Sequence, residues 1–335
     1  MSTGQRQQEE EAVRLQFALR KERSPWSDAF RQLRKNKVAV GSGIFLIFVI
    51  LTAIFADYLA PYHFADAHMA DNYRLPRLNI PILGHDPTSP YLLGADFLGR
   101  DILSRTLYGT RVSLSVGFAG ALVSLIIGII YGLISGYSSA RVDNIMMRFV
   151  DFLYGLPILI FVILLQVYFK AVARKGATGL LGAMVSLDEK MGGMFFIFVA
   201  VGALNWLGMA RITRGQVLSY KQKEFIEAAR SIGASNLRII FRHLLPNVLG
   251  PCIVAETLAI PGYIFTEAFL SFLGLGVNAP TPSWGIMISE GYIGLRSYPH
   301  LIFTPSLALT LTVLAFNFLG DGLRDAFDPR LRGTT

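Results

Sequence analysis

One polar segment of the chain, residues 211–246, has the residue types and spacing expected of a surface that docks to another protein. Alanine lets a helix seat closely against a partner, and glycine permits a sharp bend. A carboxylate offers an anionic contact, and proline sets the start of the following helix. Such a segment could carry the movement of a soluble partner into a membrane. The residues that would do so are Glu227, Ala228, Ala229, Gly233, Leu245 and Pro246.

Two short helices joined by a turn are expected to hold these residues in place. Gly233 suits the position just after a helix, where a left-handed backbone is common. Ser235 can cap a second helix over residues 236–243, and Pro246 would begin the next apolar stretch. The sequence therefore predicts a helix–turn–helix elbow. One face of its first helix would be formed by Phe225, Ala228, Ala229 and Ile232.

Two carboxylates lie within or beside the apolar stretch that follows the elbow. Glu256 falls near its middle and Glu267 near its far end. A charge at the bilayer centre costs about 2.5–3.5 kcal/mol, so it usually faces a bundle interior or a cavity. Glu256 could therefore face a translocation path or a partner subunit, near a substrate ammonium, or it could form a buried hydrogen bond to a neighbouring helix. We interpret Glu267 as a structural anchor of an outer gate, and keep both residues as candidates for the path.

The composition indicates a membrane protein. Of 335 residues, 53% are hydrophobic and 16% are charged, with a mean hydropathy of +0.47, whereas soluble domains carry about 25% charged residues. A helix needs about 20 apolar residues to cross a bilayer. The sequence therefore predicts an all-α, polytopic membrane protein with six transmembrane helices. The stretches are 38–56, 112–140, 152–169, 191–210, 244–266 (interrupted by Glu256) and 301–320.

The distribution of Lys and Arg predicts the orientation, because cytoplasmic loops carry an excess of both. With both termini in the cytoplasm, the cytoplasmic segments hold 21 of the 31 basic residues; the loop 170–190 is basic but falls outside. The net charge of +8 then reflects anchoring beside the membrane, with no nucleic acid implied. The expected parts are a cytoplasmic tail with an interfacial helix (1–37), the first transmembrane helix (38–60), an extracytoplasmic loop (61–111), a transmembrane core that includes the elbow (112–320) and a cytoplasmic tail (321–335).

Small residues recur every four positions in the second apolar stretch. This spacing is just over one helical turn, so they line one stripe of the helix and allow another backbone to approach closely. We interpret the stripe as helix packing, which is compatible with its also lining a substrate path. Its members are Gly120, Ser124, Gly128, Gly132 and Gly136.

Residues that would support catalysis are missing from the sequence. No Gly-Lys pair exists, so there is no phosphate-binding Walker loop. The single cysteine, Cys252, lies in an apolar stretch, and no Cys/His spacing suits a metal. We therefore expect no catalytic residue, metal site or cofactor in this chain.

The motifs resemble those of the C-type inner-membrane permeases of bacterial oligopeptide and dipeptide ABC importers. Beyond the elbow, the segments that carry the resemblance are 93–108, 267–276, 280–285 and 319–329. It implies a type I ABC importer permease fold in a bacterial inner membrane. It also implies a heterodimer with a related permease, two ATPase subunits that bind ATP and Mg²⁺, and an extracytoplasmic substrate-binding protein. The resemblance assigns contact with the ATPases to the six elbow residues.

The sequence alone is compatible with other substrates and mechanisms. The same importer class also carries nickel chelates and oligosaccharides. An ion-coupled secondary carrier is an alternative, although it would be expected to have several ionisable residues at mid-membrane rather than one. An intramembrane hydrolase would need a nucleophile–base pair at membrane depth, which is not seen.

Overall fold

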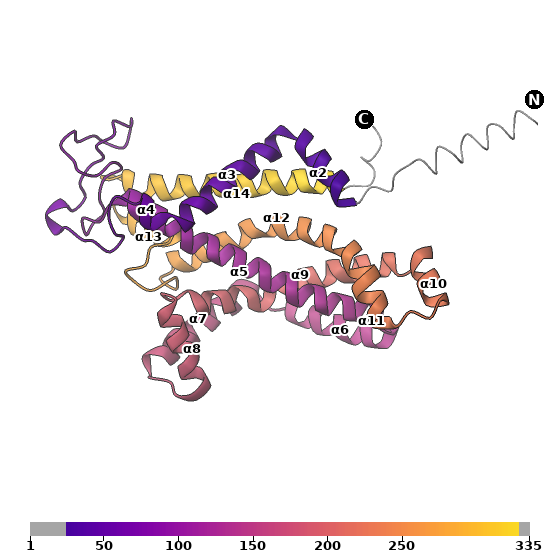
Figure 1. Ribbon diagram of the computed structural model, residues 1–335. Helices are drawn as coiled ribbons and strands as arrows, with labels where there is room; N and C mark the ends of the chain where they lie inside the picture. The colour runs from indigo at the N-terminus through magenta and orange to yellow at the C-terminus, as the bar shows by residue number, and fades with distance from the viewer. Residues whose placement is uncertain (1–24, 328–335) are drawn as a thin grey trace, which may run out of the picture.

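The computed structural model describes residues 25–327, and most of this part of the chain is helical (Figure 1). Residues 1–24 and 328–335, which are parts of the tails expected at 1–37 and 321–335, lie outside it. The long helices are α3 (Lys37–Ile54), α5 (Ile102–Tyr137), α9 (Met194–Tyr220), α12 (Leu245–Phe272) and α14 (His300–Phe327). The shorter elements are α2 (Pro25–Lys35), α4 (Ala56–Leu59), η1 (Met69–Asp71), α6 (Ala140–Tyr154), α7 (Ile158–Arg174), α8 (Gly179–Lys190), α10 (Glu224–Ser231), α11 (Asn236–Arg238), the π-helical turn η2 (Ile239–Leu244) and α13 (Trp284–Ile293).

The prediction of an all-α chain with several membrane spans is confirmed. Five helices of the described part are long and apolar enough to cross a membrane, and the count is six if α6 and α7 together form one bent span. The stretch expected at 152–169 does not form a single helix, because it includes the end of α6 and most of α7, which meet at an angle of 76°. Pro157 explains the break, since proline disfavours a helical conformation in the preceding residue and cannot donate to the turn before it.

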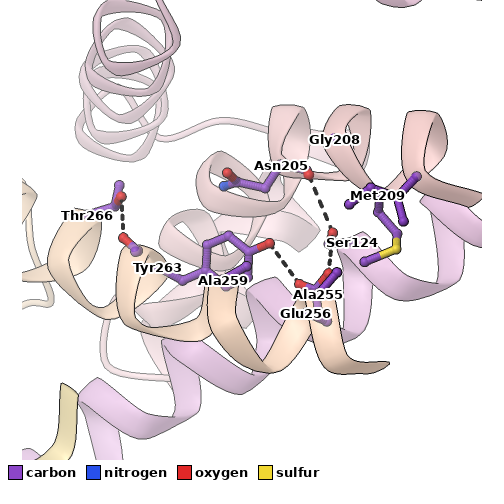
Figure 2. A pocket seen from close by; sticks show the side chains of 11 residues that line it. Ser124, Asn205, Gly208, Met209, Ala255, Glu256, Ala259, Tyr263 and Thr266 are labelled. Atoms are coloured by element: carbon purple, nitrogen blue, oxygen red, sulfur yellow. Dashed lines mark hydrogen bonds between the residues drawn. The ribbon is translucent and has the colours of Figure 1, made fainter. Parts of the chain in front are cut away.

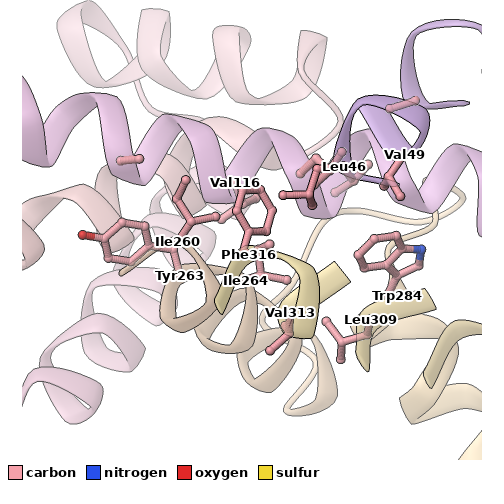
Figure 3. Close-up of a cluster of buried hydrophobic side chains, with 14 of the residues drawn as sticks. Leu46, Val49, Val116, Ile260, Tyr263, Ile264, Trp284, Leu309, Val313 and Phe316 are labelled. Carbon is pink, nitrogen blue, oxygen red and sulfur yellow. The ribbon is translucent and has the colours of Figure 1, made fainter. Parts of the chain in front are cut away.

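The central helices form a layered bundle (Figure 1). Helix α5 packs against α9 and α12, while α14 packs against both α12 and α3. Figure 3 shows the apolar core between them, where Phe316 of α14 and Ile264 of α12 lie near Val116 of α5. The outer face of α3 exposes Ile44 and Phe48, which are 64% and 61% accessible. Such exposure suits contact with lipid rather than water.

Two helices extend beyond the apolar stretches that the sequence marks. Helix α5 begins at Ile102 instead of Val112, so its first turns occupy the end of the segment expected to be a loop. Asp101 caps it by accepting a hydrogen bond from the Ser104 N–H at 2.8 Å. Helix α9 runs on to Tyr220, well into the polar segment 211–246. A hydropathy window detects only the apolar part of a helix, so it does not detect these polar turns.

Candidate functional site

The segment after α9 forms an elbow made of α10, a turn, and the helical stretch α11–η2 (Figure 1). Gly233 makes the turn with a φ of +81°. The Ala234 N–H then donates to the Ala229 carbonyl oxygen at 3.0 Å, which closes the end of α10. Only glycine adopts this left-handed backbone without strain. The direction of the second arm therefore depends on Gly233.

The inner face of α10 is packed against its own chain. Ile226 is fully buried and Ala229 is 5% exposed, in an apolar cluster that includes Ile239 and Leu244 of η2. Ala228, by contrast, is exposed. The four residues of the face expected on this helix line one hollow, but they differ in burial: Ala229 packs against η2, whereas Ala228 stays exposed. Glu227 is also exposed.

The second arm of the elbow is continuous with α12. Ser235 accepts a hydrogen bond from the Arg238 N–H at 3.4 Å and starts the helix. From Asn236 to Phe272 the chain then forms one uninterrupted helical stretch of 37 residues. The wider π-helical turn lies directly before Leu245 and Pro246, whose ring cannot donate to the preceding turn. A force on the elbow thus acts directly on α12.

A hollow of about 630 Å³ lies between the two arms. Its lining is apolar on the α10 side and basic on the α11–η2 side. The apolar side includes Ile232, which is 86% exposed, far more than an isolated aliphatic residue in water requires. The lining residues are Phe225, Ala228, Ala229, Ile232, Ala234, Arg238, Arg242 and His243.

The elbow is also tied to the end of α5. The Tyr137 hydroxyl donates to Asn236 Oδ1 at 2.9 Å, and the Arg230 guanidinium lies 5.6 Å from the centroid of the Tyr137 ring. Lys221 Nζ donates to the Gly136 carbonyl oxygen at 2.9 Å. Both arms are therefore held against a long helix of the bundle.

The small residues of α5 lie where α9 crosses closest. A Cβ added to Gly132 would be 2.5 Å from Thr213 Cβ and 2.6 Å from the Ala210 carbonyl oxygen. Gly128 and Gly136 face α9 in the same way, and Gly120 faces Val201 of α9 and Tyr263 of α12. Because glycine has no side chain, the two backbones can approach closely, as in other membrane helix pairs.

Ser124, the remaining member of the stripe, reaches Glu256 of α12. The Ser124 hydroxyl is 3.0 Å from Glu256 Oε2, and the Tyr263 hydroxyl donates to Glu256 Oε1 at 2.7 Å (Figure 2). Glu256 is 3% exposed, yet it lines a cavity of about 370 Å³ between α9 and α12. Both interpretations of this residue therefore have a structural counterpart: it bonds to a neighbouring helix and it borders a cavity.

Glu267 is fully buried. Ser113 Oγ of α5 donates to it at 3.0 Å, and Ser271 Oγ donates at 2.6 Å. The Trp284 N–H, at the start of α13, in turn donates to Ser113 Oγ at 3.3 Å. Glu267 thus joins α5, α12 and the start of α13 at one point.

The amino-acid sequence matches a known protein family. Residues 113–333 match the model of the binding-protein-dependent transport system inner membrane component. The chain belongs to this family. Residues 24–79 match a second model, the N-terminal transmembrane domain of oligopeptide transport permease C. The chain is thus a multi-pass membrane component of a binding-protein-dependent transport system.

Individual relatives of this transport component cover nearly its whole length. It is 43% identical over 306 residues to the dipeptide transport system permease protein DppC of Bacillus subtilis, covering 91% of this chain and 86% of the relative. It is 42% identical to the oligopeptide transport system permease protein OppC of Haemophilus influenzae, covering 97% and 94%. An inward-facing structure of the MetNI methionine ABC transporter matches 67% of the chain and 96% of its own, with a TM-score of 0.48 and 18% identity.

Sequence reasoning missed a buried charge cluster at the end of this transport component opposite the elbow. Asp96 Oδ2 lies 2.7 Å from Arg100 Nε and 3.1 Å from an Arg105 guanidinium nitrogen. Arg105 also contacts Glu290 of α13 at 2.9 Å and is 1% exposed. Burial raises the pKa of the Glu290 carboxyl above its ordinary value, against the opposing effect of Arg100. Glu290 is distant in sequence, and only an unusual density of charges at 96–105 hinted at the cluster.

Proposed function

We propose that this chain is the C-type permease subunit of an ATP-driven importer of dipeptides or oligopeptides. The proposal rests on one observation. Over nearly its full length, the chain is 41–43% identical to permeases whose names specify dipeptide and oligopeptide transport. A permease of glutathione transport, 40% identical over 92% of the chain, also handles a peptide-like substrate. Peptides are therefore preferred here over nickel chelates and oligosaccharides.

The proposed orientation places the elbow and both termini in the cytoplasm. The excess of Lys and Arg in the segments at that end supports it. Helix α10 and the last turns of α14 lie at the same end of the bundle (Figure 1). The segment 60–101 and α13 would then face the extracytoplasmic side, where a substrate-binding protein docks.

The elbow is proposed as the contact with one of two ATPase subunits, which bind ATP and Mg²⁺, while a related second permease completes the membrane unit. The hollow between the arms supports this, because it combines exposed apolar surface with Arg238 and Arg242. A partner segment carrying a carboxylate beside an apolar side chain would match it. The exposed Glu227, on the outer face, would meet a basic group.

Uptake by cells that lack the chain tests the proposed function. We expect deletion of its gene to abolish ATP-dependent uptake of labelled dipeptides and tripeptides, and the wild-type gene to restore it. Uptake that persists without the ATPases and collapses with the ion gradient would instead identify a secondary carrier. Loss of nickel or oligosaccharide uptake, with peptide uptake intact, would refute the proposed substrate.

A further inference from the structure

The cavity beside Glu256 contains a buried carboxylate that has no cationic neighbour. Its two hydrogen-bond donors, Ser124 and Tyr263, are neutral hydroxyls. Ser124 Oγ also lies 3.4 Å from the Asn205 carbonyl oxygen, but a hydroxyl has one proton and Glu256 is nearer. No ion pair of residues 25–327 includes Glu256. A buried carboxylate is costly in its ionised form without an opposite charge, and a cation that enters the cavity from outside the described chain would stabilise that form.

Small residues keep the space next to this carboxylate open. Gly208, Ala255, Ala259 and Gly262 all line the cavity. A Cβ on Gly262 would have no heavy atom within 4 Å, so this glycine is not required by packing inside the chain. The volume of about 370 Å³ lies within the range of small-ligand pockets, roughly 300–1,000 Å³.

Further hydrogen-bond acceptors follow along the same cavity. Asn205 Nδ2 bonds to the Val201 carbonyl oxygen, which can only accept, so the side-chain Oδ1 of Asn205 remains as an acceptor. The Thr266 hydroxyl donates to the Gly262 carbonyl oxygen at 2.8 Å and can likewise only accept from a ligand. From Glu256 to Thr266 the helix rises about 15 Å, the length of about four residues of extended peptide.

We infer that this cavity binds the protonated amino terminus of the transported peptide against Glu256, with the peptide extending along α12 towards Thr266. An ammonium group donates three hydrogen bonds. Ser124 and Tyr263 each use one lone pair of Glu256, so about two of the four acceptor sites of this carboxylate remain for the ammonium. Amide N–H groups further along the peptide meet the acceptors on Asn205 and Thr266. The peptide therefore lies with its amino end nearer the elbow. The inference rests on the function proposed above and specifies which substrate group the permease recognises.

Three variants of the assembled importer in proteoliposomes test this inference, using a labelled dipeptide and saturating substrate-binding protein. Glu256→Gln keeps the shape and removes the charge, Glu256→Asp keeps the charge, and Gly262→Val fills the cavity. We expect E256Q to lower uptake efficiency about ten- to a hundredfold, as loss of a charged hydrogen bond does. E256D should lose much less. G262V should lose uptake while ATP hydrolysis stimulated by the loaded binding protein stays within about twofold of the wild type.

Uptake by E256Q at the wild-type rate would overturn the inference. A parallel loss of uptake and stimulated ATP hydrolysis in E256Q would also overturn it, because it would indicate a structural role for the carboxylate. If the wild-type importer itself takes up no peptide, the proposed function fails instead. The two failures are therefore separate results of one experiment.

Discussion

Ala228 and Ala229 are neighbours on α10, and replacing each with glutamate should affect the stability of the elbow to very different degrees. Ala228 is exposed at the rim of the hollow, so a carboxylate there stays in water in the free chain. We expect A228E to change the free energy of unfolding by less than about 0.5 kcal/mol. Ala229 is 5% exposed against Ile226 and Ile239, so A229E should destabilise the elbow by about 3 kcal/mol or more.

Association with the ATPase should respond differently from stability. In A228E the new carboxylate would be buried at the proposed interface without a partner. A cost of about 3 kcal/mol there corresponds to about 150-fold weaker binding. The measurements are co-purification of the ATPase subunits and thermal unfolding of the chain in detergent. A228E should lose the ATPases and keep its melting temperature, whereas A229E should lose both.

The matched control is Ala228→Ser, which is small and neutral and should retain the ATPases. If A228E also retained them, at the same stoichiometry as the wild type, the elbow would not be the contact and the proposed coupling would be refuted. A lowered melting temperature in A228E would contradict the exposed position of Ala228.

Three further predictions concern packing and backbone. Gly132→Ala should destabilise the chain by about 1–3 kcal/mol, because its Cβ meets the backbone of α9, whereas Gly215→Ala on α9, with nothing within 4 Å, should not; thermal unfolding of both variants checks this. Arg105→Ala should cost about 3–5 kcal/mol, because it takes a buried cationic partner away from Asp96 and Glu290. Arg111→Ala loses a partly exposed pair with Asp57 and hydrogen bonds to the Ala53 and Ile54 carbonyl oxygens, and should cost less; equal melting temperatures would contradict the burial. Gly233→Val should cost about 1–2 kcal/mol from its left-handed backbone and increase proteolysis of the elbow.

The elbow was largely predictable because its signals are local. The glycine at Gly233 and the cap at Ser235 are statements about a few neighbouring residues, and both are realised in the backbone. The difference in burial between Ala228 and Ala229 was not predictable. Helical spacing says that residues share a face, but the side that packs inward depends on Ile239 and Leu244, which the turn brings back.

Helix ends and long-range polar contacts were the features that sequence reasoning located least well. The break between α6 and α7 had a local sign in Pro157, which apolar content over 152–169 concealed. The early start of α5 had one in Asp101, a good helix cap. The contacts of Glu256 with Ser124 and of Glu290 with Arg105 join separate helices, and a single sequence carries no record of such pairs.

The continuous helical stretch from Asn236 to Phe272, which includes a π-helical turn and Pro251 and Pro261, would act as a lever if the elbow moved. Its pivot would be Glu267, which accepts hydrogen bonds from hydroxyl groups of α5 and α12. At a rise of 1.5 Å per residue, the tip at Asn236 is about 46 Å from that fulcrum and Glu256 is about 16 Å from it. A swing of about 3 Å at the tip would thus shift Glu256 by about 1 Å, a displacement comparable to the difference between making and losing a hydrogen bond.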